Sequence, residues 1–180
     1  MQAQVSIYSR EEIETLLQKG FPDRAAVISF YYKDTEPVDL SGIPNEVFQV
    51  AVEDVDLYDL EQLGLTYMTF FPEAEELVKF ILTARNAGME IICQCEYGQG
   101  PSAGCAAAIR QFYNGDGIEV FTNGRYFPNL LMYHKVYSSL DSEWQFCLAY
   151  GIDPPKPKRR ARGGILSMFR RRRHRDACEI

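Results

Sequence analysis

The fold of this chain is decided by residues 89–103, which read Met89-Glu90-Ile91-Ile92-Cys93-Gln94-Cys95-Glu96-Tyr97-Gly98-Gln99-Gly100-Pro101-Ser102-Ala103. The apolar run up to Cys93 predicts a short buried strand. The small residues after Ser102 predict a helix, and the glycines between the two predict a tight turn. In a strand–turn–helix unit the N–H groups of the turn converge, and the helix N-terminus adds positive potential. The stretch therefore predicts an anion-binding loop.

Cys95 stands at the mouth of this predicted loop. A thiolate is stabilised beside a helix N-terminus, so a cysteine in this place is a strong nucleophile near neutral pH. Gly98 and Gly100 complete neither of the glycine patterns that bind nucleotides, G-x-G-x-x-G and G-x-x-x-x-G-K-[ST]. The loop thus points to thiol chemistry. A redox sensor built on Cys93 and Cys95 is an alternative, which requires an exposed thiol of low pKa.

Strands and helices alternate along the chain on both sides of the loop. Ser9 and Glu12 form a capping box that opens a short helix, and Gly20 ends it. Such alternation favours a mostly parallel sheet with helices on both faces, an α/β fold. The other predicted elements are strands at 25–30, 47–52 and 89–93 and helices at 72–88, 103–109 and 128–140, with a further helical segment around Trp144.

The charges divide the chain into two parts. Residues 1–153 carry 9 Lys and Arg against 23 Asp and Glu, a net charge of −14, whereas residues 154–180 carry 10 against 2, a net of +8. Pro154-Pro155-Lys156-Pro157 marks the end of the folded unit. We predict one domain over 1–153 and a disordered basic tail over 154–180. Without a signal sequence or a run of 18 apolar residues, the expected location is cytoplasmic.

Two basic clusters in the tail, 156–162 and 170–175, flank the apolar residues 165–169. This arrangement suits an anionic membrane surface, which attracts each nearby basic residue by about 1 kcal/mol. We therefore expect a membrane-peripheral location as one outcome, and a tail folded back on the acidic body as another. Nucleic acid is not expected as a partner, because no series of aromatic residues for base stacking accompanies the charge. A solvated, disordered tail is the simplest interpretation.

The loop resembles the signature of the cysteine-dependent protein phosphatases, His-Cys-x5-Arg-Ser. It is most similar to a small bacterial branch of the tyrosine and dual-specificity phosphatases that reads Cys-Glu-Ala-Gly-x-Ser-Arg-Ser-Ala. Asp54 and Asp56 follow a predicted strand, where this family keeps its general acid. Tyr126-Phe127-Pro128-Asn129-Leu130-Leu131 is similar to the Pro-Asn-x-Leu start of a late helix in that branch. The likeness covers residues 25–140, and it is strongest in the loop.

The resemblance implies hydrolysis of a phosphomonoester, in a phosphoprotein or a small molecule, through a phosphocysteine intermediate. Cys95 would attack phosphorus, and Ser102 would hydrogen-bond the thiolate and help it leave in the second step. Asp54, in preference to Asp56, would protonate the leaving oxygen; a solvated acidic loop is the alternative interpretation of these two carboxylates. No metal and no cofactor are implied. The phosphate-binding loop would consist of Glu96, Tyr97, Gly98, Gln99, Gly100 and Pro101.

Two residues depart from the family pattern. Gln94 replaces the histidine, and Pro101 replaces the arginine that grips two phosphate oxygens with a planar fork. Proline also lacks an N–H, yet it suits the first turn of a helix. Removing one preorganised donor of this kind lowers the rate by about 10²–10³, and a charged bidentate group should matter more. The two departures predict a phosphatase fold that has lost tight phosphate binding.

Arg110 and Arg125 are the candidates to replace the missing charge. Arg110 lies on the predicted helix after the loop at a position expected to face away, and Arg125 lies in a turn that the sequence does not place. We therefore predict a phosphatase relative with weak or lost hydrolysis. The alternatives are a working enzyme with a displaced arginine, a noncatalytic pseudophosphatase that binds a protein partner through the loop, and the redox sensor.

Overall fold

The computed structural model describes residues 2–43 and 45–151. The predictions made for residues 154–180, namely the disordered tail, the domain boundary before it and the membrane surface, lie outside the described residues. Between residues 2 and 151 no helix is both long and apolar enough to cross a membrane.

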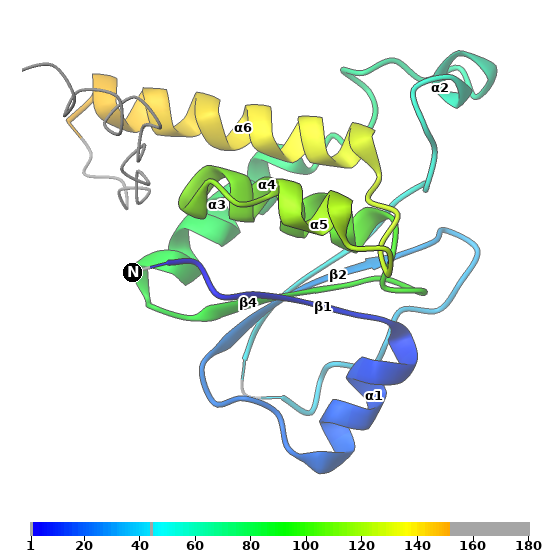
Figure 1. Ribbon diagram of the computed structural model, residues 1–180, viewed down its shortest axis with the longest axis vertical. Coiled ribbons are helices and arrows are strands. Elements are labelled where there is room, and N and C mark those ends of the chain that lie inside the picture. Colours follow the sequence, from blue (N-terminus) through cyan, green and yellow to red (C-terminus); the bar gives the residue numbers. More distant parts are fainter. Residues whose placement is uncertain (1, 44, 152–180) are drawn as a thin grey trace, which may run out of the picture.

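The described chain builds one four-stranded sheet in which every neighbouring pair of strands is parallel (Figure 1). The strand order is β1-β4-β2-β3, so β4 lies between two neighbours. This arrangement confirms the predicted α/β class with a parallel sheet. The strands are β1 (Val5–Tyr8), β2 (Ala25–Tyr31), β3 (Glu46–Ala51) and β4 (Glu90–Gln94); the helices are α1 (Arg10–Lys19), α2 (Asp59–Gln62), α3 (Ala74–Asn86), α4 (Pro101–Asn114), α5 (Ile118–Thr122) and α6 (Leu130–Ala149).

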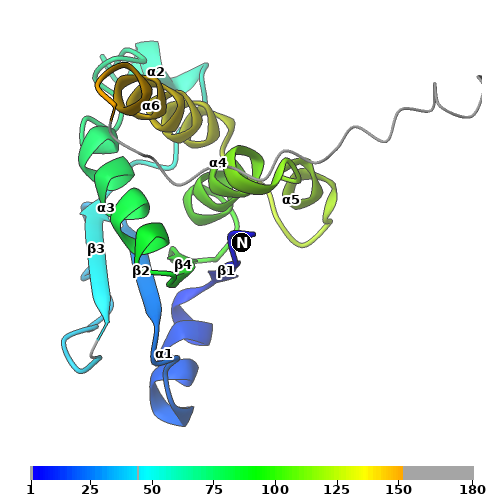
Figure 2. The same cartoon turned by 90° about the vertical axis from the view of Figure 1, so that its left-hand side faces the viewer.

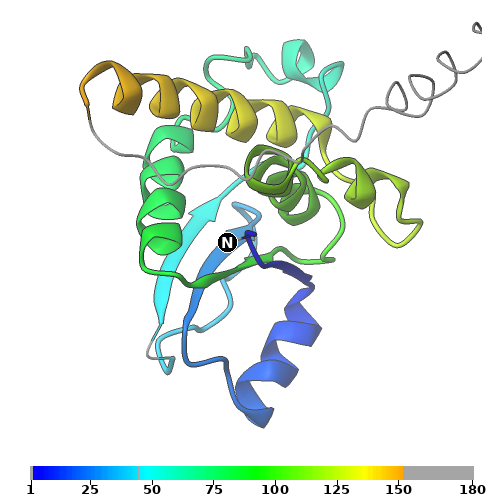
Figure 3. The same cartoon turned by 60° about the vertical axis from the view of Figure 1, so that its left-hand side comes forward.

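Helices cover both faces of the sheet, as predicted. Helix α1 lies on one face with the segment 38–43, whereas α3 and α4 lie on the other, and α6 crosses over them on the outside (Figures 2 and 3). Each face of the sheet has its own buried cluster. The cluster on the α1 side contains Ile13, Val27 and Ile92. The cluster on the other side contains Ile28, Ile91 and the inner side chains of α3, α4 and α6. Because β4 is buried on both faces, its sequence is nearly all apolar.

Several local signals have the predicted effect. Ser9 and Glu12 form both hydrogen bonds of the capping box, and Gly20 donates its N–H to Leu16 O at the end of α1. The strand predicted at 89–93 is β4, which places Cys95 directly after a central strand. The helix after the loop begins at Pro101, where the fixed backbone angle of proline suits a first helical turn.

Four elements differ from the prediction. Strand β1 was not predicted, because it has four residues with a serine inside it; its strand conformation depends on pairing with β4, Val5 opposite Ile91. The short helices α2 and α5 were not predicted either, since four or five residues carry too little periodicity. The two helical segments predicted after Pro128 form one continuous helix, α6, because neither glycine nor proline interrupts residues 130–149.

Candidate functional site

The candidate site is the turn between β4 and α4. Cys95 follows the last residue of β4 and is buried, and its Sγ lies 2.9 Å from Oγ of Ser102 in the first turn of α4. The turn needs glycine at Gly98, where φ is +66° and an added Cβ would lie 2.7 Å from the backbone nitrogen of Ser9. The loop therefore packs closely on the start of α1, and it presents the thiol together with a hydroxyl.

The carbonyl groups and the N–H groups of the loop differ in their hydrogen bonding. Three of its carbonyl groups accept hydrogen bonds: Glu96 O accepts the N–H of Arg10 at 3.1 Å, Gln99 O accepts that of Phe127 at 3.3 Å, and Gly100 O accepts that of Asn129 at 3.1 Å. Among the described residues, no N–H group from 96 to 100 donates a hydrogen bond to another protein atom. Unpaired amides beside a helix N-terminus form a cradle suited to an oxyanion. The N–H groups of residues 96–100 are thus without a protein partner among the described residues, and the predicted anion-binding cradle stays a prediction.

The arginine that contacts this loop is Arg10, which sequence reasoning did not single out. Its Nε donates to Glu96 Oε2 at 2.7 Å, and a second nitrogen donates to the carbonyl of Glu36. The pairing joins the start of α1 to the loop and leaves the charge of Arg10 balanced by a carboxylate of the loop itself. No local sequence signal relates these residues, because only the parallel pairing of β1 with β4 brings Arg10 beside Glu96.

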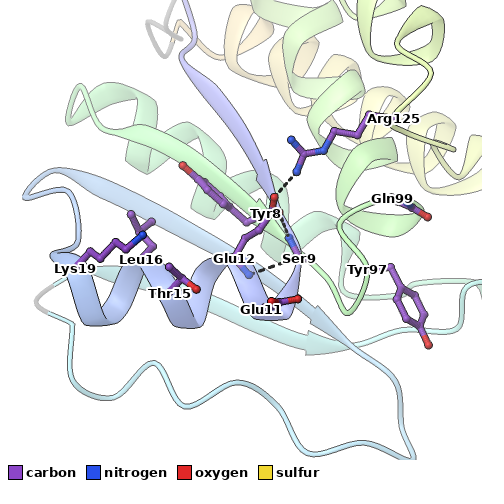
Figure 4. Close-up of a pocket in the computed structure, with 10 residues that line it drawn as sticks. All are labelled: Tyr8, Ser9, Glu11, Glu12, Thr15, Leu16, Lys19, Tyr97, Gln99 and Arg125. Carbon is purple, nitrogen blue, oxygen red and sulfur yellow. Dashed lines mark hydrogen bonds and ion pairs between the residues drawn. The ribbon is translucent and has the colours of Figure 1, made fainter.

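The two arginines considered as replacements are engaged elsewhere. Arg110 binds Asp116 and Glu119 at the far end of α4, and the hydrogen bond with Asp116 is the main cause of its raised pKa. The prediction that Arg110 faces away from the loop is confirmed. Arg125 pairs with Glu12 and lies over the ring of Tyr126. It lines a pocket of about 580 Å³ beside the loop, where Figure 4 shows its guanidinium turned to Glu12.

Asp54, the preferred candidate for the general acid, lies against the loop. A Cβ placed on Gly100 would overlap the Asp54 carboxylate, and this contact gives Gly100 its own reason to be glycine. Asn129 Nδ2 donates to Asp54 Oδ1 at 2.9 Å. Asp56 instead accepts the N–H groups of Tyr58 and Asp59 in the turn that leads into α2. Of the two carboxylates, Asp54 is the one placed to meet a group bound in the loop.

Tyr32 at the end of β2 adds a hydroxyl to the same edge of the sheet, with its Oη 3.5 Å from Asp54 Oδ2. Burial, followed by the nearby charges of Asp54 and Cys95, raises the pKa of Tyr32 well above its ordinary value. The phenol therefore stays protonated over the physiological range, and it is available as a donor at the mouth of the loop. Sequence reasoning missed Tyr32, because no motif marks it.

Asn129 connects the parts of the site. Its Nδ2 binds Asp54 and the carbonyl of Val55 at 2.8 Å, its Oδ1 caps α6 by accepting the N–H of Met132 at 2.8 Å, and its own N–H binds Gly100 O. An amide side chain performs all these roles because it carries a donor and an acceptor. Asn129 thereby couples the loop, the acidic segment and the start of α6.

Replacing Asn129 by Asp should separate these roles. Asn129→Ala should lower the free energy of unfolding by about 2 kcal/mol. The helix cap contributes about 1 kcal/mol, and the hydrogen bonds from Nδ2 together contribute about another 1 kcal/mol. Aspartate retains the cap but offers no donor, and it places a second carboxylate beside Asp54. We therefore expect Asn129→Asp to be destabilised as well, by roughly 1–2 kcal/mol in urea denaturation. An aspartate variant as stable as the parent protein would reduce Asn129 to a helix cap.

The remaining cysteines bear on the redox hypothesis. Cys93, Cys95, Cys105 and Cys147 are all free thiols, and Cys105 and Cys147 are core residues, as their apolar neighbours indicate. Burial, with a smaller effect of the neighbouring Cys105, raises the pKa of Cys93 well above its ordinary value. Cys93 thus lacks the exposed, acidic thiol that a redox pair with Cys95 requires.

Gln94, at the position of the family histidine, is buried and belongs to a polar chain across three strands. Its Oε1 accepts from Ser29 Oγ at 2.7 Å, and Ser29 Oγ in turn accepts from Gln49 Nε2 at 3.2 Å. Ser29 lies on β2 and Gln49 on β3, so the side chain of Gln94 is committed to the sheet interior.

Comparison with known proteins places this geometry in a known fold. No family model matches the chain, and no curated protein sequence is significantly similar to it. The structure of PTPMT1 in complex with PI(5)P matches over 80% of this chain and 94% of its own, at 12% identity and a TM-score of 0.51. Human DUSP28 matches 79% of this chain and 94% of its own, also at 12% identity, with a TM-score of 0.49.

Tk-PTP in its active form matches 78% of this chain and 93% of its own, at 15% identity and a TM-score of 0.48. The match to PTPMT1, the one of the three with a TM-score above 0.5, shows that the chain has the fold of the dual-specificity and tyrosine phosphatases. The resemblance found in the loop is therefore confirmed at the level of the fold.

Proposed function

We propose that this protein uses the phosphatase fold with a loop in which phosphomonoester hydrolysis through Cys95 is weak or lost. The observation that carries the proposal is the first turn of α4. Ser102 Oγ lies 2.9 Å from Sγ of Cys95, the proposed nucleophile. The residue before Ser102 is the buried Pro101, where the resembled family has an arginine.

The retained parts support an origin in phosphoryl-transfer chemistry. The loop keeps a thiol, a set of unpaired amides and a carboxylate at the mouth, which are the groups that attack phosphorus, hold an oxyanion and protonate a leaving oxygen. Hydrolysis at a low rate is therefore compatible with the site, and the resemblance of the loop assigns these roles to Cys95, Ser102 and Asp54.

The lost part explains why the rate should be low. Three of the described arginines are paired with carboxylates: Arg10 with Glu96, Arg125 with Glu12, and Arg110 with Asp116 and Glu119. The other two, Arg24 and Arg85, donate to backbone carbonyls. Asp54 adds negative charge at the mouth. A phosphate dianion would thus meet amide dipoles without a fixed cation, and charge-assisted hydrogen bonds are roughly twice as strong as neutral ones.

A noncatalytic binding module is the second candidate, and a specific observation favours it. Large apolar side chains stand exposed around the mouth of the loop, namely Tyr97 within it and Phe127 and Leu130 at the start of α6. The N–H of Phe127 donates a hydrogen bond to Gln99 O in the loop. Exposed aromatic side chains of this kind are typical anchors for a protein partner.

Turnover and oxyanion binding together test the proposal. Wild-type protein should hydrolyse para-nitrophenyl phosphate at a rate within about tenfold of the Cys95→Ser variant, because the loss of the arginine removes the grip on the transition state. Tungstate at millimolar concentration should raise the midpoint of thermal unfolding by no more than a degree or two, as a cradle of neutral dipoles predicts.

Rapid hydrolysis that Cys95→Ser abolishes would contradict the proposal, and Arg10 would then be the first residue to mutate. A rise of several degrees in the unfolding midpoint with tungstate would also contradict it, because such tight binding requires a fixed cation at the loop.

A further inference from the structure

A partly apolar groove lies beside α3 and α6, apart from the loop. It has a volume of about 520 Å³ and runs between the start of α3, the segment 66–72 and α6. Met68 and Phe146 stand on its two sides with 76% and 50% of their surfaces exposed, although both are apolar. Exposed apolar side chains gathered in a groove indicate a surface that another segment covers.

Hydrogen bonds join two walls of this groove, α6 and the segment 66–72. Lys135 on α6 donates to the carbonyls of Tyr67 and Met68, and the hydroxyl of Tyr67 lies 3.0 Å from Ser138 Oγ. Phe71, at the end of the segment, has φ +49°, a left-handed conformation that disfavours a bulky residue, and its buried ring packs on Phe30. The segment 66–72 is thus hydrogen-bonded to α6, and it is packed on β2 through Phe71.

The apolar surface continues to the end of the described chain. The ring of Tyr150 lies 4.4 Å from that of Phe146, one turn further along α6, and 71% of its surface is exposed. Residue 151 follows directly, and residues 152–180 extend the chain from there. The groove therefore opens at the place where the C-terminal segment begins.

Two carboxylates and one ammonium group line the groove, and the ammonium group of Lys135 donates to the carbonyls of Tyr67 and Met68. Glu75 and Glu143 line it, and among residues 2–43 and 45–151 neither has an ion-pair partner. The C-terminal segment is basic, and its one apolar run, residues 165–169 (Ile-Leu-Ser-Met-Phe), is followed directly by Arg170-Arg171-Arg172-Arg173. An apolar run followed by arginines complements an apolar groove with carboxylates at its edge.

We propose that the groove between α3 and α6 binds residues 165–173 of the same chain. The apolar residues 165–169 occupy the floor between Met68 and Phe146, and the arginines that follow pair with Glu75 and Glu143. Docking of this kind covers the exposed apolar surface and withdraws the arginine cluster from other anionic partners. The inference does not depend on the chemistry of Cys95.

The connecting chain is long enough for this docking. Residues 152–164 lie between residue 151 and the apolar run, and 14 steps of chain reach up to about 46 Å when fully extended. The groove extends back along α6 from Phe146 to Lys135, which is about 24 Å from residue 151 at 1.5 Å per helical residue. Tethering at this distance gives an effective concentration in the millimolar range, so even weak complementarity would suffice.

Photo-cross-linking in the full-length chain tests the proposal. With benzoylphenylalanine in place of Phe169, irradiation should join residue 169 to residues within 67–78 or 138–146, identified by mass spectrometry. A mixture of isotopically labelled and unlabelled chains should yield cross-links within one chain only. Phe146→Asp should reduce the yield at least about tenfold, because it places a charge where an apolar ring is buried. Met68→Asp, a second exposed position, should do the same.

Ile118→Asp provides the matched control. Ile118 is a similarly exposed apolar residue on α5 that does not line the groove, so this variant should retain the parent yield. Cross-links between labelled and unlabelled chains would overturn the proposal in favour of a second copy of the protein. Cross-links to the mouth of the loop, an unchanged yield in both groove variants, or cross-linking no higher than in an unfolded sample would also overturn it. If most of the protein sediments with phosphatidylserine vesicles and the cross-link within the chain is lost, the segment would be assigned to a membrane.

Discussion

Replacing Pro101 by arginine should raise the rate of para-nitrophenyl phosphate hydrolysis by two or more orders of magnitude. The variant returns a bidentate, permanently charged donor to the position where the loop meets α4, and a preorganised donor of this kind contributes about 3 kcal/mol or more to transition-state stabilisation. It also restores an N–H, which proline lacks. The thiol, the hydroxyl at 2.9 Å and the unpaired amides are already in place to receive the phosphate.

Two controls isolate the effect of position. Adding Cys95→Ser to Pro101→Arg should remove the gain, because the covalent route then has no thiolate. Gln99→Arg places the same charge in the same loop, on an exposed residue two positions earlier. We expect at most a small gain from Gln99→Arg, since an arginine aimed at solvent cannot grip two phosphate oxygens. Steady-state kinetics of the four proteins, with kcat and KM determined separately, distinguishes a better transition-state grip from better substrate binding.

An absence of gain in a folded Pro101→Arg variant would mean that the site differs from a working phosphatase at more than one residue. The salt bridge between Arg10 and Glu96 and the carboxylate of Asp54 at the mouth are then the next features to change, and the binding module would become the better proposal. An equal gain from Gln99→Arg would show that added charge, and not its geometry, limits the rate.

Replacing Gly98 by alanine should produce the largest loss of stability among single methyl additions in the loop. Gly98 has φ +66°, which costs an L-residue about 1–2 kcal/mol. An added Cβ would also lie 2.7 Å from Ser9 N and 2.9 Å from the carbonyl carbon of Tyr8, both backbone atoms that cannot rotate away. Overpacking of this kind costs about 1–3 kcal/mol, so we expect a total near 3 kcal/mol, or a fall of about 6–12 °C in Tm.

Gly64→Ala is the control for the backbone angle alone. Gly64 has the same φ of +66°, but no heavy atom lies within 4 Å of a Cβ added there. Its substitution should cost about 1 kcal/mol, a fall of about 2–4 °C in Tm for a chain of this size. Equal losses in the two variants would contradict the close packing of the loop on the start of α1. A loss that is large only for Gly98→Ala would confirm that the loop is held by steric contact with Ser9.

The sequence by itself determined the elements that carry their own local signals. The capping box of Ser9 and Glu12, the apolar run before Cys95 and the glycines of the loop each specify a conformation through neighbouring residues. The alternation of strands and helices then determined the parallel α/β class. The loop motif also indicated the phosphatase fold, because the strand, turn and helix that carry the motif are built from consecutive residues.

The tertiary structure alone decided which distant side chains meet at the loop. Strand β1 forms because β4 pairs with it, and that pairing brings Arg10 to Glu96 across 86 positions of sequence. Asn129 reaches Asp54 across 75 positions, and this contact distinguishes Asp54 from Asp56, two residues that the sequence presents as nearly equivalent. Whether an arginine replaces the lost charge is likewise a matter of packing: Arg110 and Arg125 are neutralised by carboxylates that lie beside them only in the folded chain. Ion pairs between separate elements depend on where the elements pack, and no periodicity or spacing records that.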